Sequence, residues 1–159
     1  MSQGVSGIDL ETSLGYLLKE ASSALRTAME AVLRPLGMGI THYSCLELLS
    51  QQPGLSNSDL ARGTFVSRQS MNVLLQALER DGLVSRPEQA LAGRVLPTEL
   101  TLSGRQQLAT ATAAVKAVED QMKSSLSGDE QTQLRSLLSR CVVSLSGSIE
   151  ESSSKGLAL

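Results

Sequence analysis

The sequence predicts a mainly α-helical fold with one short β-hairpin. Hydrophobic residues make up 41% of the 159 residues but aromatic residues only 2%, so the core must consist of Leu, Ala, Val and Met, as it does in packed helices. Apolar residues recur at helical spacing along most of the chain, and this period is lost between Leu83 and Thr101. A chain of this length forms one domain, or one domain with helical extensions.

The first predicted helix spans Ile8 to about Leu36, where Pro35 and Gly37 end its 3.6-residue period. A shorter helix over 41–50 and a turn over the Gln-Gln-Pro-Gly that follows come next. A first helix of about seven turns is longer than a compact domain of this size needs. Part of its apolar stripe is therefore expected to pack against something outside the domain.

Two helices joined by a short turn are predicted between Leu55 and Arg86. Gly63 and Thr64 end the first helix, Ser67 caps the start of the second, and Gly82 ends the second as a left-handed cap. The second helix has one apolar stripe with residues at i, i+3, i+4 and i+7: Met71, Leu74, Leu75 and Leu78. Its opposite face carries side chains that can bind purine edges in a DNA major groove: Arg68, Gln69, Asn72 and Gln76.

The positions of the charged residues favour a nucleic-acid partner more strongly than the net charge does. Fourteen Lys and Arg against sixteen Asp and Glu give a net charge of -2, which does not by itself indicate a nucleic-acid partner. However, no acidic residue lies between Asp59 and Glu79, and the segment from Leu55 to Arg105 contains arginines but no lysine. Guanidinium groups bind phosphate and guanine as a planar fork. The alternative, a solvated face of an ordinary helical domain, remains open.

Two extended segments, 83–86 and 94–101, flank a Gly-containing loop and predict a β-hairpin. Pro97 cannot donate a hydrogen bond to a sheet, so its strand is an edge or is interrupted there. A hairpin that follows a reading helix is the wing of a winged helix-turn-helix, and its tip lies along the DNA backbone or in the minor groove. Arg86 and Arg94 are the candidate contacts. For Arg94, a surface arginine in a loop is the alternative.

Two further amphipathic helices are predicted near the C-terminus. Thr101 or Ser103 can cap the first, and Ser127 with Glu130 forms a capping box for the second. Together with the first helix they have more apolar face than one chain can cover. We therefore expect a homodimer joined through its terminal helices, with its two reading helices about one turn of DNA apart.

Several other classes of protein are disfavoured. No apolar run approaches the roughly 20 residues that span a bilayer, and the N-terminal residues do not resemble a secretory signal, so a cytoplasmic protein without a membrane segment is expected. Cys45 and Cys141 form no CxxC or Cys/His cluster, so no metal site, disulfide framework or cofactor is expected. His42 has no nucleophile or acidic partner at local spacing, and no enzyme is predicted.

From about Leu14 to Ile149 the chain resembles the MarR (multiple antibiotic resistance regulator) family of winged-helix transcription regulators. The resemblance rests on LGYLLKEASSALRTAMEAVLRPLGM in the first helix, on Asp59-Leu60-Ala61, on LERDGLVSR, and on Leu100-Thr101 followed by Gly104. It implies a single MarR-like domain over 1–159, with dimerisation helices over 8–36 and 103–151 and a DNA-binding winged helix-turn-helix over 39–102. It also implies a homodimeric repressor of a palindromic operator in double-stranded DNA.

The DNA-contact residues expected from the pattern and the resemblance are Ser67, Arg68, Gln69, Asn72, Gln76, Arg86 and Arg94. Relatives often carry Asp-x-Arg at the wing tip, where this chain has Ala92-Gly93-Arg94, and a Thr-Arg pair where it has Asn72-Val73. Gly39 replaces the Thr or Ser that usually caps the second helix.

Relatives commonly release DNA when a small aromatic or phenolic ligand, or an oxidant, acts where the dimer helices meet the reading domain. The resemblance implies that Tyr16, His42, Tyr43 and Cys45 line such a pocket in this chain. Oxidant sensing is disfavoured because Cys45 has no nearby Lys or Arg to stabilise a thiolate. The main alternative function is a winged-helix module that binds protein rather than DNA, such as an antirepressor.

Overall fold

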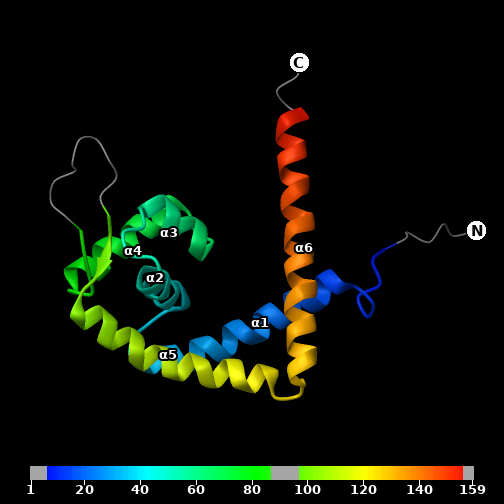
Figure 1. Ribbon diagram of the computed structural model, residues 1–159, viewed down its shortest axis with the longest axis horizontal. Coiled ribbons are helices and arrows are strands. Elements are labelled where there is room, and N and C mark those ends of the chain that lie inside the picture. Colours follow the sequence, from blue (N-terminus) through cyan, green and yellow to red (C-terminus); the bar gives the residue numbers. More distant parts are fainter. Residues whose placement is uncertain (1–6, 87–96, 156–159) are drawn as a thin grey trace, which may run out of the picture. The chain divides into compact units, whose positions relative to one another are not determined.

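The computed structural model describes residues 7–86 and 97–155. The chain divides into two compact units, one over 1–118 and one over 119–159, and each is described here by itself. The elements in chain order are α1 (Leu14–Leu33), the 3-10 turn η1 (Arg34–Leu36), α2 (Ile40–Gln51), α3 (Asn57–Thr64), α4 (Arg68–Arg80), β1 (Val84–Ser85), β2 (Glu99–Leu100), α5 (Leu102–Lys123) and α6 (Gly128–Lys155), all shown in Figure 1. The predicted mainly helical fold with one hairpin is confirmed.

The core of the first unit lies between the end of α1, the three helices α2 to α4, the hairpin and α5. It consists mostly of aliphatic and sulfur-containing side chains, as the composition predicts, and Tyr43 is its aromatic member. Its largest fully buried hydrophobic side chains are Leu33, Cys45, Leu46, Leu49, Leu60, Met71, Leu75 and Leu78. This core fixes the positions of α3 and α4.

Helix α1 begins at Leu14 and not at Ile8, so the predicted start is wrong. The Asp9 carboxylate accepts a hydrogen bond from the Glu11 amide at 3.1 Å, which favours a turn over a helix. Ser13 then caps α1 by accepting from the Tyr16 amide at 3.1 Å. The predicted end is confirmed, since η1 follows and Gly37 is left-handed.

The hairpin pairs β1 with β2 in an antiparallel register, with Val84 opposite Leu100. Thr98 also forms an isolated antiparallel bridge with Leu55, which the sequence analysis did not anticipate. The bridge joins the segment before α3 to the strand after the loop. Both described strands are shorter than the predicted segments, and residues 87–96 lie outside the described part of the chain.

Helix α5 is attached closely to the end of α4. The Thr101 hydroxyl donates to the Gly82 carbonyl at 2.6 Å and accepts from the Gly104 amide at 3.0 Å, so Thr101, and not Ser103, caps α5. A Cβ atom on Gly104 would lie 2.1 Å from the Leu83 carbonyl oxygen, closer than any non-bonded contact allows. The first turn of α5 therefore requires glycine at this position.

We predict that Gly104→Ala lowers the free energy of unfolding by on the order of 3 kcal/mol, because the added methyl group forces α5 away from the backbone of Leu83. Urea denaturation measures this loss. The control is Gly147→Ala in α6, where nothing lies within 4 Å of the added Cβ. It should be neutral or slightly stabilising. Equal stabilities of the two variants would contradict the close packing.

The second unit contains the end of α5 and all of α6. The predicted capping box is confirmed: the Ser127 amide donates to Glu130 at 2.9 Å, and the Glu130 amide donates to the Ser127 hydroxyl at 3.2 Å. Large apolar side chains of α6 are exposed: Leu134, Leu137, Leu138, Val142, Val143 and Leu145. Among the residues that the structure describes, no helix has the length and apolar character to cross a membrane.

Candidate nucleic-acid interface

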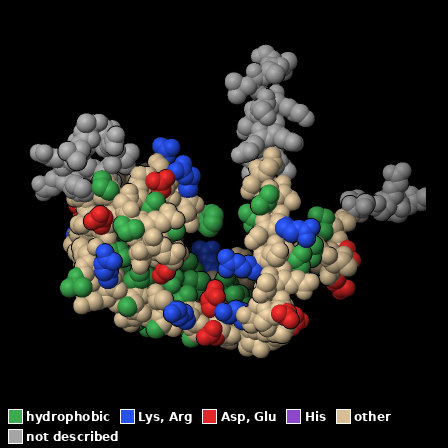
Figure 2. All heavy atoms as spheres, in the orientation of Figure 1, with side chains coloured by type: hydrophobic (Ala, Val, Ile, Leu, Met, Phe, Trp, Pro, Cys, Tyr) green, Lys and Arg blue, Asp and Glu red, His purple; other side chains and the backbone are tan. Residues whose placement is uncertain are grey.

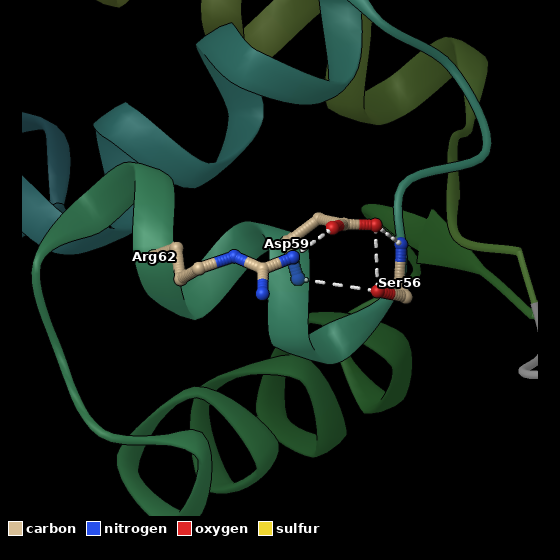
Figure 3. Close-up of polar contacts among 3 residues, drawn as sticks. All are labelled: Ser56, Asp59 and Arg62. Atoms are coloured by element: carbon tan, nitrogen blue, oxygen red, sulfur yellow. Dashed lines mark hydrogen bonds and ion pairs between the residues drawn. The ribbon is translucent and has the colours of Figure 1, made fainter. Parts of the chain in front are cut away.

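Helix α3 starts with a capping box that the sequence analysis did not identify. The Ser56 hydroxyl accepts from the Asp59 amide at 3.1 Å, and the Asp59 carboxylate accepts from the Ser56 amide at 3.2 Å (Figure 3). The Arg62 guanidinium also pairs with this carboxylate. These bonds, those from Ser56 first, hold the pKa of Asp59 below its usual value. The Asp59 carboxylate therefore stabilises the N-terminus of α3.

The turn between α3 and α4 is tight. Phe65 is left-handed, with φ 61°, and its amide donates to the Arg62 carbonyl at 3.3 Å. The next amide, of Val66, donates to the Ala61 carbonyl at 3.1 Å, which closes the end of α3. A Cβ atom on Gly63 would lie 2.6 Å from a methyl carbon of Leu48, so glycine lets α3 approach α2. The predicted end of α3 at Thr64 is confirmed, but Gly63 lies within the helix and the chain turns at Phe65.

Helix α4 begins at its predicted cap, since the Ser67 hydroxyl accepts from the Ser70 amide at 3.1 Å. Of its predicted apolar stripe, Met71, Leu75 and Leu78 are fully buried and Leu74 is partly buried. The Met71 sulfur lies 4.0 Å from the Cys45 sulfur on α2. This packing fixes the rotation of α4 about its own axis.

The opposite face of α4 is exposed. It carries all four predicted reading residues, Arg68, Gln69, Asn72 and Gln76, next to the exposed cap Ser67, and it also carries Val73. Figure 2 shows acidic and basic side chains interspersed over the visible surface of this part of the chain, in keeping with its small net charge. The exposed face of α4 thus carries amide and guanidinium groups, with Val73 among them, and it has no carboxylate before Glu79.

The two predicted wing arginines are placed differently. Arg86 follows β1 and forms an ion pair with Glu79 of α4 at 2.9 Å, and its side chain is only 21% exposed. Local sequence patterns do not reveal this pair, because the two residues are on opposite sides of the Gly82 turn. Arg94 lies outside the described residues.

The four residues expected to line an effector pocket have different surroundings. Tyr16 is 47% exposed on the first turn of α1, whereas Tyr43 is buried on α2 and its hydroxyl donates to Glu47 at 3.5 Å. Burial lowers the pKa of His42, an effect opposed by Gln107 and Asp81. Cys45 is fully buried beside Met71, which is on α4.

A groove of about 550 Å³ between α2 and α5 was not anticipated. Glu47 lines it from α2, and Arg105, Thr112 and Lys116 line it from α5. The Thr112 hydroxyl donates to Glu47 at 3.4 Å across the groove. Of the expected pocket residues, Tyr43 is connected to this groove through its bond to Glu47. A sequence signal did exist, because residues 105, 112 and 116 share one face of α5.

Burial raises the pKa of the Cys45 thiol to about 12. At pH 8 only about one molecule in ten thousand then carries the reactive thiolate. We predict that native Cys141→Ser protein, which keeps Cys45, does not react with a colorimetric disulfide reagent until guanidinium unfolds it. The reciprocal variant Cys45→Ser keeps the exposed Cys141 as a control for the reagent. Rapid labelling of native Cys141→Ser would show that Cys45 is accessible.

Among the described residues, no group of three or more His, Cys, Asp or Glu side chains could hold a metal ion. What the described residues do provide is a short helix, a tight turn, a second helix with an exposed polar face and a hairpin. These elements define the winged helix-turn-helix class of DNA-binding proteins.

The comparisons with known proteins identify the family. The MarR family model matches residues 36–95. The HTH-type transcriptional repressor Rv2887 of Mycobacterium tuberculosis is 38% identical over 134 residues, which are 84% of this chain and 96% of that protein. The chain belongs to the MarR family of transcription regulators.

Solved structures of the same mycobacterial protein agree with this assignment. Its complex with DNA has a TM-score of 0.69 and 37% identity, and the match covers 82% of this chain and 98% of that one. Its complex with salicylic acid has a TM-score of 0.67 and 38% identity, and the match covers 82% and 96% of the two chains.

Proposed function

We propose that this chain is a repressor that binds a palindromic operator as a homodimer and places α4 in the major groove of each half-site. The observation that carries this proposal is the orientation of α4, whose apolar stripe is buried while Arg68, Gln69, Asn72 and Gln76 are exposed. The DNA complex of the mycobacterial relative supports it. A cytoplasmic location is part of the proposal, since the operator DNA is there.

Exposed apolar side chains support the homodimer. The first half of α1 exposes Leu14, Leu17 and Leu18, and α6 exposes a longer series of leucines and valines. Apolar faces of this extent on single helices favour packing against other helices. In a twofold dimer each copy uses the same apolar faces to contact the other copy. We propose that both copies of α4 can then bind one duplex.

The proposed base contacts are made by Arg68, Gln69, Asn72 and Gln76, with Ser67 close to the phosphate backbone. Arg94, from the sequence alone, is proposed as a wing contact. Arg86 remains a proposed contact, and in that role its guanidinium would have to share its hydrogen bonds between Glu79 and a phosphate.

We predict that Arg68→Ala weakens operator binding by about 1 to 3 kcal/mol and reduces the preference for operator over random duplex, because a bidentate contact to guanine is lost. Fluorescence anisotropy with both duplexes measures this. Arg26→Ala on α1 removes the same charge and a single exposed ion pair with Glu30, so it serves as the matched control. Equal losses of operator affinity in the two variants would contradict base reading by Arg68. Failure of the wild-type chain to bind any operator duplex would favour the protein-binding alternative.

A small aromatic acid is the proposed effector, acting at the groove between α2 and α5. Arg105 and Lys116 offer two cations to a carboxylate, and Leu108 offers an apolar surface to a ring. The salicylic acid complex of the relative supports this ligand class. Tyr43 is proposed to act through Glu47, and His42, Tyr16 and Cys45 remain the other proposed pocket residues.

We predict that salicylate lowers operator affinity and that Tyr43→Phe and Lys116→Gln each weaken this response severalfold. The first removes a hydroxyl that donates to Glu47, and the second removes a cation from the groove. Titration of the protein-operator complex with salicylate measures the response, and Cys141→Ser is the control. A wild-type response in both variants would place the effector elsewhere.

A further inference from the structure

One exposed apolar side chain on α4 has no role in the interface described above. Between Arg34 and Thr101, the large hydrophobic residues that are exposed in the described chain are Phe65, at 94%, and Val73, at 63%. Phe65 belongs to the turn before α4. Val73 lies within α4 itself, among the polar residues of its exposed face.

Local stability does not account for a valine at this position. Valine forms helices less well than Ala, Gln or Arg, and a valine that is 63% exposed gains little from burial. A β-branched side chain in a helix is held in one preferred rotamer, so its two methyl groups have a fixed direction. Val73 therefore presents a rigid apolar surface where a surface helix would ordinarily carry a polar side chain.

The helical spacing places this surface next to groups that read bases. Val73 is four residues after Gln69 and three before Gln76, so the three side chains are neighbours on the exposed face. Glutamine and asparagine pair with the edge of adenine, whereas valine can make only van der Waals contact. In the major groove the apolar group of a base pair is the C5-methyl of thymine.

We propose that Val73 contacts the C5-methyl of one thymine in each half-site and thereby specifies thymine at that position. This inference rests on the proposed docking of α4 in the major groove and adds a base preference to it. Since the contact involves a single methyl group, its loss should weaken binding about fourfold.

The test replaces each thymine of the operator, one position at a time in both half-sites, with deoxyuridine, which lacks only the C5-methyl. The operator is first selected from random duplexes with the wild-type protein. Dissociation constants are then measured for wild type, Val73→Ala and Val143→Ala. Val143 is an exposed valine on α6, 71% accessible, so its variant makes the same chemical change outside α4. Any effect of that variant on assembly is the same for all duplexes and cancels in the comparison.

At one position in each half-site, deoxyuridine should weaken binding by the wild-type protein about fourfold for each thymine methyl that is lost. At that position Val73→Ala should bind the thymine and deoxyuridine duplexes equally well. Val143→Ala should retain the wild-type sensitivity at every position. If Val73→Ala binds the operator but keeps the full sensitivity at every thymine, the inference is overturned while the proposed function stands. If the wild-type protein selects no duplex, the proposed function fails and the inference fails with it.

Discussion

The burial of one side of α4 is the constraint on which the rest of the structure depends. Met71, Leu75 and Leu78 have almost no exposed surface, and the Met71 sulfur lies against the Cys45 sulfur of α2. Turning α4 by half a revolution would expose these side chains, at a cost of about 2 kcal/mol each, and would bury amide and guanidinium groups without partners. The hydrophobic core thus determines which residues of α4 face outward.

Hydrogen bonds at both ends of α4 fix where the helix begins and ends. Ser67 caps its start, and Gly82 turns the chain at its end, where the Gly82 carbonyl accepts from the Thr101 hydroxyl at 2.6 Å. Thr101 caps α5, whose next turns line the groove with Arg105. The groove and the end of α4 are therefore connected by one short hydrogen-bonded segment. This connection supports the proposal that a ligand bound in the groove lowers operator affinity.

The features that the sequence predicted are those with a local cause. The buried stripe of α4, the caps at Ser67 and Ser127 and the left-handed Gly82 each depend on residues within a turn or two, so periodicity and capping rules identify them. The predicted start of α1 at Ile8 is wrong because the side chain of Asp9 forms a turn that competes with the helix. Three features could not be predicted in this way: the Thr98–Leu55 bridge, the Arg86–Glu79 ion pair and the groove. Each joins residues that are separated in sequence and become neighbours only when the chain folds.

If the exposed face of α4 lies against DNA, a photoreactive side chain on that face will cross-link to a bound duplex. A benzophenone amino acid is placed at position 69 of α4 or, as a comparison, at the exposed position 106 of α5. We expect irradiation with a selected operator duplex to link DNA to the protein from position 69 and not from position 106. Cross-links from position 106 with none from position 69, in protein that still binds the duplex, would contradict this placement.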